Sequence, residues 1–283
     1  MTARARLGVV LLGVVLLGAG CAAKSDVFSA LPPIPSGGKP TPSRVIWHDL
    51  LTADPAGVQR FYGGLFGWQF TPVNERYALV HNGDRAIGGI ATVPASDGSQ
   101  WLPQFSTPDI DRSLYVASRA GGTVLLGPID VGARGRMAIV RDPQAAIFGL
   151  IQTRDGDPPE VSPKNGDWLW HEAWVSDLEG ATAYYPQVFG FLLETQKIGS
   201  APYQYFRTVE SARAGVLLKP DPTLGNAWVS YVRVADIKAV VARATELGGR
   251  VLFAPDPGVR RGSLAILADP GGDGIVVQQW PMP

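Results

Sequence analysis

The stretch that decides the fold is Trp170-His171-Glu172, because it repeats Trp47-His48-Asp49 at a distance of 123 residues. Aromatic landmarks recur at the same distance: Phe61-Tyr62 with Tyr184-Tyr185, and Phe66-Gly67-Trp68 with Phe189-Gly190-Phe191. Later landmarks recur at 127 residues: Trp101 with Trp228, Asp109-Ile110 with Asp236-Ile237, Ala120-Gly121-Gly122 with Leu247-Gly248-Gly249, and Asp142-Pro143 with Asp269-Pro270. A four-residue insertion explains the change, and the ordered series identifies an internal duplication.

The duplication sets the domain boundaries. The first copy spans 44–153 and the second spans 167–281, and residues 154–166 between them form a Pro- and Gly-rich linker. The length of 283 residues fits two domains. With 46% hydrophobic residues, 18% charged residues and no net charge, the chain has an ordinary globular composition, so we expect no nucleic-acid partner.

The N-terminus reads as an export signal. Arg4 and Arg6 precede an apolar run over 7–17, and small residues lead to Cys21, the only cysteine. The run is shorter than the roughly 20 apolar residues of a membrane-spanning helix. Residues 1–20 are similar to a bacterial lipoprotein signal, which implies lipidation of Cys21. An ordinary secretory signal or a short anchor, with Cys21 incidental, is the alternative interpretation.

These features predict a protein of the cell envelope, anchored by its lipid to a membrane on the extracytoplasmic side. Cys21 and the residues up to 43 include five prolines, so 21–43 is predicted to be a tether that builds no helix or central strand. Whether the protein dimerises stays open.

Each copy is itself doubled. In the second copy the pattern predicts a strand at 169–175, a helix at 178–188 and strands near 191–195, 203–208 and 212–218, then a strand at 228–234, a helix at 236–247 and strands near 250–254, 264–268 and 274–279. Asp177 and Asp236 stand where helix N-caps are expected, and Gly248-Gly249 stands where the second helix should end. The expected class is α+β, with two tandem domains of two βαβββ modules each.

This arrangement resembles the vicinal oxygen chelate superfamily, which includes glyoxalase I, extradiol dioxygenases and bleomycin-resistance proteins. The matching segments cover nearly all of 44–281 and include 61–68 and the two Asp-Pro turns. The resemblance implies that two modules curl into an incomplete mixed barrel whose concave face holds the ligand. It also implies a divalent metal that is bound by His, Gln or Glu side chains and acts as a Lewis acid.

The residues at the implied metal-ligand positions argue against that metal. These positions are Trp47, Leu102 and Gly149 in the first copy and Trp170, Val229 and Val276 in the second. His48 and His171 are one residue out of register, so they should point to the opposite face of their strands. We therefore expect no cofactor and no metal chemistry. The alternative is a metal-dependent lyase or dioxygenase that uses a histidine with Asp49 or Glu172.

The predicted concave faces are rich in aromatic residues. The candidate ligand-binding residues share inward-facing strand positions: Trp47, Asp49, Gln104, Trp170, Glu172, Trp174, Tyr231 and Arg233. A mostly apolar cleft with few charges suits a small, partly apolar molecule. We therefore predict a metal-free binding protein, with bleomycin-resistance sequestration as the nearest analogue. In a third hypothesis the tryptophans fill the clefts and the surface contacts other envelope proteins. The basic loops 132–136 and 258–262 lie at equivalent places in the two copies and are expected to be solvated hairpin turns. The alternative is that they rim a pocket and attract an anionic ligand.

Overall fold

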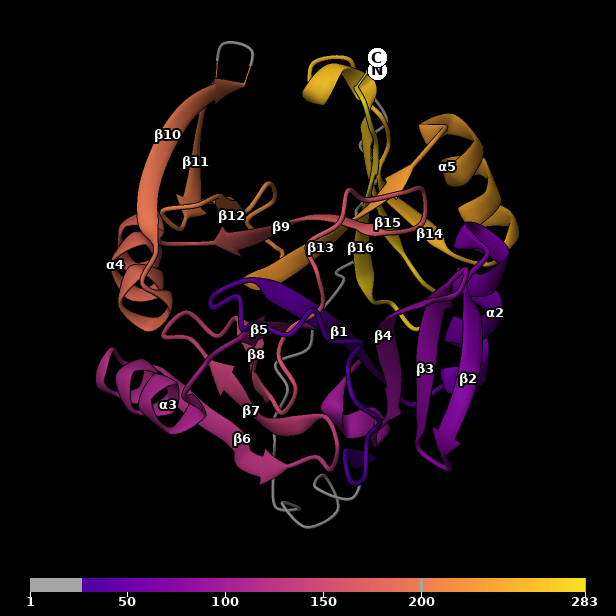
Figure 1. Ribbon diagram of the computed structural model, residues 1–283. Helices are drawn as coiled ribbons and strands as arrows, with labels where there is room; N and C mark the ends of the chain where they lie inside the picture. Colours follow the sequence, from indigo (N-terminus) through magenta and orange to yellow (C-terminus); the bar gives the residue numbers. More distant parts are fainter. Residues whose placement is uncertain (1–26, 199–200, 283) are drawn as a thin grey trace.

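A computed structural model of the chain, which describes residues 27–198 and 201–282, contains two eight-stranded mixed sheets (Figure 1). The predicted signal over 1–20 and Cys21 lie outside the described residues. Within the part of the chain that is described, no helix is both long enough and apolar enough to span a membrane.

The two sheets have the same topology. The first has the order β2-β3-β4-β1-β5-β8-β7-β6 and the second has the order β10-β11-β12-β9-β13-β16-β15-β14. Neither sheet closes on itself, which confirms the predicted α+β class with two tandem incomplete barrels. In the second sheet, β9 runs parallel to β12 and antiparallel to β13, as β1 does with β4 and β5 in the first.

The elements of the first domain are β1 (Val45–Thr52), α2 (Pro55–Phe66), β2 (Gln69–Asn74), β3 (Tyr77–Asn82), β4 (Arg85–Thr92), η1 (Ala95–Asp97), β5 (Gln100–Ser106), α3 (Ile110–Arg119), β6 (Thr123–Asp130), β7 (Gly135–Arg141) and β8 (Ile147–Thr153). Those of the second are β9 (Trp168–Val175), α4 (Leu178–Phe189), β10 (Leu192–Ile198), β11 (Ala201–Arg207), β12 (Ala212–Leu218), β13 (Ala227–Val234), α5 (Ile237–Glu246), β14 (Arg250–Phe253), η2 (Arg260–Gly262), β15 (Leu264–Ala268) and β16 (Gly274–Gln279).

The predicted helix boundaries are confirmed. The Asp177 side chain accepts a hydrogen bond from the amide of Gly180, and the Asp236 side chain caps α5 in the same way. Gly248 follows the end of α5 with a φ of 83°, a left-handed conformation that glycine adopts without steric cost.

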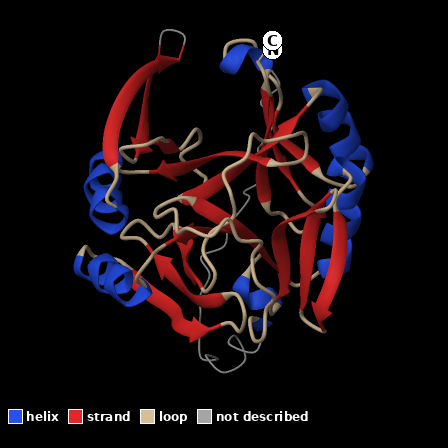
Figure 2. Cartoon of the chain, viewed as in Figure 1, coloured by secondary structure: helices blue, strands red, loops and turns tan. Residues whose placement is uncertain are grey.

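The two domains pack back to back. Helix α2 lies against α5, and α3 lies against α4, so helices of different domains form two pairs at opposite edges of the molecule (Figures 1 and 2). Each pair covers an apolar cluster that contains residues of both domains. The concave faces of the two sheets therefore point away from each other.

Residues 27–34 do not form the spacer that the sequence predicts. Val27, Phe28 and Leu31 are buried against the concave face of the first domain, and Ile34 packs beside Trp47. The prediction counted the prolines of 21–43 but overlooked these four apolar side chains. Burying each of them is worth about 1.5–3 kcal/mol, which favours docking over free extension.

Candidate functional site

The concave face of the second domain is organised around β9. Trp170, Glu172 and Trp174 alternate along this strand and therefore share one face. Glu172 lies opposite Gly215 of β12, and Trp170 lies opposite Tyr231 of β13. The register predicted from the repeat is thus the observed one.

Glu172 is the centre of this face and is 1% exposed. Its carboxylate accepts hydrogen bonds from four side chains: Trp174 Nε1 at 3.0 Å, the Tyr203 hydroxyl at 2.8 Å, the Tyr231 hydroxyl, and Arg260 Nη2 at 2.5 Å. These four donors satisfy the buried carboxylate without water. Burial and the nearby Glu172 charge raise the pKa of both tyrosines, so both hydroxyls stay protonated donors at neutral pH.

Arg260 reaches the cleft from η2. Arg260 and Arg261 have φ values of 45° and 58°, a left-handed conformation that is strained for residues with a Cβ. The Arg260 guanidinium lies 5.5 Å from the ring centre of Tyr203, and it donates to Gln278 Oε1 at 3.1 Å. Burial alone would lower the pKa of Arg260, but Glu172 raises it above its ordinary value.

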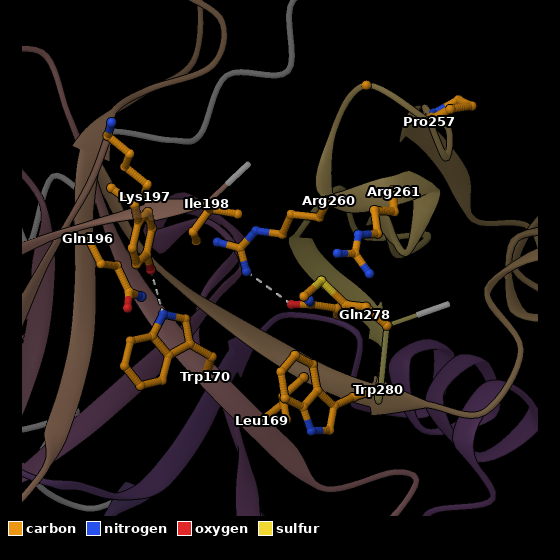
Figure 3. Close-up of a pocket in the computed structure, with 13 residues that line it drawn as sticks. Leu169, Trp170, Gln196, Lys197, Ile198, Pro257, Arg260, Arg261, Gln278 and Trp280 are labelled. Carbon is orange, nitrogen blue, oxygen red and sulfur yellow. Dashed lines mark hydrogen bonds between the residues drawn. The ribbon is translucent and has the colours of Figure 1, made fainter. Parts of the chain in front are cut away.

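A cavity of about 750 Å³ opens beside this cluster (Figure 3). Trp170 forms part of its wall, and its indole nitrogen donates to the Tyr203 hydroxyl at 2.7 Å. Lys197 and Arg261 bring two more positive charges to the lining, and Trp280 adds a second indole. The cavity therefore combines aromatic surface with an excess of positive charge.

The first domain repeats the cluster. The Asp49 carboxylate accepts hydrogen bonds from Trp47 Nε1 at 3.1 Å, the Tyr77 hydroxyl at 2.5 Å and Gln104 Nε2 at 2.9 Å. Arg134 donates to the Tyr77 hydroxyl at 2.9 Å, and its guanidinium lies 4.4 Å from the Trp47 ring centre. Both arginines thus lie inside the clefts, and the prediction that loops 132–136 and 258–262 are solvated turns is wrong for Arg134 and Arg260.

Two glycines make room for the tyrosines. Gly89 lies opposite Asp49 in the first sheet, and Gly215 lies opposite Glu172 in the second. A Cβ on either glycine would overlap the hydroxyl of Tyr77 or Tyr203. The carboxylate, the tyrosine and the glycine therefore form one unit that recurs in both domains.

Of the eight predicted ligand-binding residues, seven have side chains in the clusters of the two concave faces. Arg233 shares the strand face of Tyr231, but its Nη1 donates to the carbonyl of Pro163 in the linker at 2.6 Å. It is absent from the lining of the cavity beside Trp170. Arg134 and Arg260 were not predicted as site residues: the sequence indicates the equivalent places of their loops, but solvated turns were preferred to the rim of a pocket.

The side chains that could coordinate a metal ion do not form a complete ligand set on either concave face. The residue beside Trp47 and Gly149 in the first sheet is Gln104 and not the predicted Leu102, and of these three side chains only that of Gln104 could coordinate a metal. In the second sheet the residue beside Trp170 and Val276 is Tyr231 and not the predicted Val229. His48 and His171 lie on the opposite faces of their strands, as predicted, with their Nε2 atoms 2.8 Å apart. Among residues 27–198 and 201–282, no three His, Cys, Asp or Glu side chains are arranged to hold a metal ion.

Comparisons with known proteins agree with this fold. Residues 169–278 match the model of the Glyoxalase/Bleomycin resistance protein/Dioxygenase superfamily. The protein CFP32 of Mycobacterium bovis, which carries a provisional glyoxylase name, is 29% identical over 236 residues, covering 80% of this chain and 90% of its own. The anthracycline biosynthesis protein DnrV of Streptomyces peucetius is 28% identical over 256 residues, covering 83% and 93%.

Two solved structures share the architecture at low sequence identity. Homoprotocatechuate 2,3-dioxygenase from Arthrobacter globiformis has a TM-score of 0.59 at 14% identity, covering 88% of this chain and 82% of its own. The Mn(II)-bound glyoxalase from Novosphingobium aromaticivorans has a TM-score of 0.58 at 12% identity, covering 84% and 82%. At such identities the likeness concerns the fold alone.

Proposed function

Because residues 169–278 belong to the Glyoxalase/Bleomycin resistance protein/Dioxygenase superfamily and the first domain repeats their fold, we propose that this protein binds a small, flat, anionic molecule in its second domain. The observation that carries the proposal is the cavity of about 750 Å³ beside the Glu172 cluster. Ligand pockets for drug-sized molecules are about 300–1,000 Å³, so the size is suitable.

The charge of the cavity favours an anion. Glu172 is the buried carboxylate there, and its ion pair with Arg260 at 2.5 Å neutralises it. Lys197 and Arg261 also line the cavity, and none of its described lining residues is an Asp or Glu. A carboxylate, sulfonate or phenolate would find the cationic groups of Lys197 and Arg261 in the lining.

The shape of the lining favours a flat, partly apolar body. Trp170 and Trp280 present indole surfaces to the cavity (Figure 3). Tyr203 contacts both Trp170, through a hydrogen bond, and the Arg260 guanidinium, which faces its ring. Aromatic rings stack on such surfaces with about 0.5–1.5 kcal/mol beyond the burial of area. We propose binding without turnover, because the donor set at the family's metal positions does not fit a metal.

A matched pair of probes tests this function. The anionic dye 1-anilinonaphthalene-8-sulfonate and its neutral parent N-phenyl-1-naphthylamine share the same rings, so they separate charge from shape. We expect calorimetric titration to give one dye site per chain. The pair Lys197→Gln and Arg261→Gln should weaken the anionic dye about tenfold and leave the neutral one within twofold.

The control removes the same charge elsewhere. Arg112 and Lys238 are exposed on α3 and α5, and their change to Gln should alter neither affinity. Equal weakening of both dyes in the cleft variant would contradict an anion site. Equal weakening of the anionic dye by the control pair would show attraction by net charge alone.

Export and anchoring form a separate part of the proposal. We infer that Cys21 is lipidated, so that six residues at most join the lipid to the docked segment that begins at Val27. Six extended residues span about 20 Å, so the first domain would lie close to the bilayer. Labelling of cells with a palmitate analogue should mark the protein, and Cys21→Ser should abolish both the label and its membrane fractionation.

A further inference from the structure

The first domain contains a cleft with the same side-chain unit as the second. The equivalent pairs are Trp47 and Trp170, Asp49 and Glu172, Tyr77 and Tyr203, and Arg134 and Arg260. The second cleft opens to a cavity, whereas the first is filled by residues 27–34. Two copies of one binding unit thus differ mainly in their occupant.

The side chain of Arg134 indicates that residues 27–34 do not satisfy every polar group of the first cleft. Arg134 is 2% exposed, and its Nη2 atom has no hydrogen-bond partner. Asp49 is one methylene shorter than Glu172 and is not paired with Arg134, which instead donates to the Tyr77 hydroxyl. Buried cations are rarely left without an anion, because desolvation of the charge is costly. The buried Oε1 atom of Gln104 in the same cleft also lacks a partner.

The docked segment supplies apolar contacts and a single acceptor to this arginine. Phe28 packs edge-on against Tyr77, with their ring centres 6.2 Å apart, and Leu31 is buried in the same cluster. The carbonyl of Pro32 accepts from Arg134 Nε at 3.1 Å. A backbone carbonyl carries no net charge, so the segment resembles a flat ligand that lacks its acidic group.

We propose that the cleft of the first domain is a second site for the same class of flat anionic molecule, and that residues 27–34 occupy it when no ligand is bound. The proposal rests on the proposed function for the ligand class. Its own evidence is the repeated unit, the unpartnered guanidinium nitrogen and the apolar occupant. The incoming anion would pair with Arg134, and its rings would replace Phe28 and Leu31.

The test counts dye sites in the full-length protein. In the Phe28→Ser, Leu31→Ser variant the segment loses its apolar anchors, so calorimetry with 1-anilinonaphthalene-8-sulfonate should give two sites in place of one. Adding Arg134→Gln to this variant should remove the new site alone. The control pair Val209→Ser, Leu218→Ser changes side chains that are 83% and 56% exposed, and it should keep one site.

The outcomes separate the two proposals. A segment variant that gains no site over the wild type, or a gained site that survives Arg134→Gln, overturns the inference made here. If the wild-type protein binds no dye but the segment variant binds one equivalent that depends on Arg134, the proposed function of the second domain fails and this inference stands. If the Phe28→Ser, Leu31→Ser variant does not unfold in one cooperative transition, Phe28→Ala takes its place. The absence of a weaker second site in Phe28→Ala would overturn the inference in the same way.

Discussion

The Nε2 atoms of His48 and His171 lie 2.8 Å apart, so the two copies of one sequence motif meet between the back-to-back sheets. His48 is 3% exposed and stacks on Trp168 with a ring-centre distance of 3.9 Å. Residues that resemble metal ligands in the sequence therefore contribute to the contact between domains.

This histidine contact should make stability depend on pH. Burial lowers the pKa of His171 to about 3, and burial with the neighbouring His171 lowers that of His48 well below its ordinary value. An unfolded histidine titrates near pH 6.5, so below that pH the unfolded state takes up protons that the folded state does not. The stabilisation is therefore complete above about pH 6.5 and decreases as the pH falls toward 3.

The expected loss is about 2 kcal/mol per histidine between pH 7.5 and 5. Urea denaturation at pH 7.5, 6.5 and 5.0 measures it. The double variant His48→Gln, His171→Gln should show a shallower dependence on pH, whereas His81→Gln, which changes the third histidine, should keep the wild-type slope. An unchanged slope in the double variant would show that the pair does not control stability.

Hydrogen bonds across the domain boundary are reciprocal. The Tyr185 hydroxyl donates to Asp142 Oδ2 at 2.6 Å, and the equivalent Tyr62 hydroxyl donates to Asp269 Oδ2 at 3.3 Å. Tyr185→Phe leaves a buried carboxylate without this donor, so the free energy of unfolding should fall by about 1–3 kcal/mol. Tyr115→Phe, at a side chain that is 68% exposed, should change it by less than about 0.5 kcal/mol. If Tyr185→Phe and Tyr115→Phe lower the free energy of unfolding equally, as measured by thermal and urea unfolding, the hydrogen bond has no role in stability.

The sequence predicted those residues of the site whose positions follow from the internal repeat and from the alternation of side chains along a strand. The repeat aligned β1 with β9, and the alternation of strand residues then placed Asp49 and Glu172 on the concave faces. Tyr231 was placed correctly for the same reason. The alternation along β13 also places Arg233 on the strand face of Tyr231, but its guanidinium donates to the carbonyl of Pro163 in the linker, a contact that no strand pattern indicates.

Two features had no periodic signal. Arg134 and Arg260 lie at or beside loops, where no alternation indicates a direction, and only a strained backbone turns Arg260 inward. The docking of Phe28 and Leu31 depends on a surface that forms only when the distant strands of the first sheet assemble. A pattern that is local in sequence does not contain that information.

Gly215 should be essential for the second cleft. A Cβ there would overlap the Tyr203 hydroxyl and approach Glu172, so Gly215→Ala should displace Tyr203 and break its bond to the carboxylate. We expect the affinity for the anionic dye to fall about tenfold, as measured by fluorescence titration. Gly274→Ala is the matched control, because its Cβ would meet no atom within 4 Å. Wild-type affinity in Gly215→Ala would show that the dye binds without the tyrosine.

Binding should not depend on a metal. Among residues 27–198 and 201–282 no three His, Cys, Asp or Glu side chains are placed to hold a metal ion, so dialysis against EDTA should leave the dye affinity within twofold. Elemental analysis of the purified protein should find far less than one equivalent of zinc, iron, manganese or nickel. A stoichiometric metal that disappears in Glu172→Ala would contradict the proposal directly and would favour metal-dependent chemistry.

Glu172 should oppose the anion that the cleft binds, although it lies at the centre of the site. Its charge neutralises Arg260 at 2.5 Å, and Glu172→Gln would release that cation toward the ligand. We expect the affinity for 1-anilinonaphthalene-8-sulfonate to rise about threefold to tenfold, with no change for the neutral N-phenyl-1-naphthylamine. The free energy of unfolding should fall by about 3 kcal/mol, because a buried ion pair loses one partner.

The opposite signs of these two effects make the test specific. A general loosening of the cleft would weaken both dyes and the fold together. The control is Asp49→Asn, whose carboxylate lies in the other cleft and accepts from Trp47 and Gln104. It should reduce stability without raising the affinity of the second domain. Tighter binding of both dyes in Glu172→Gln would show that shape, not charge, governs this site.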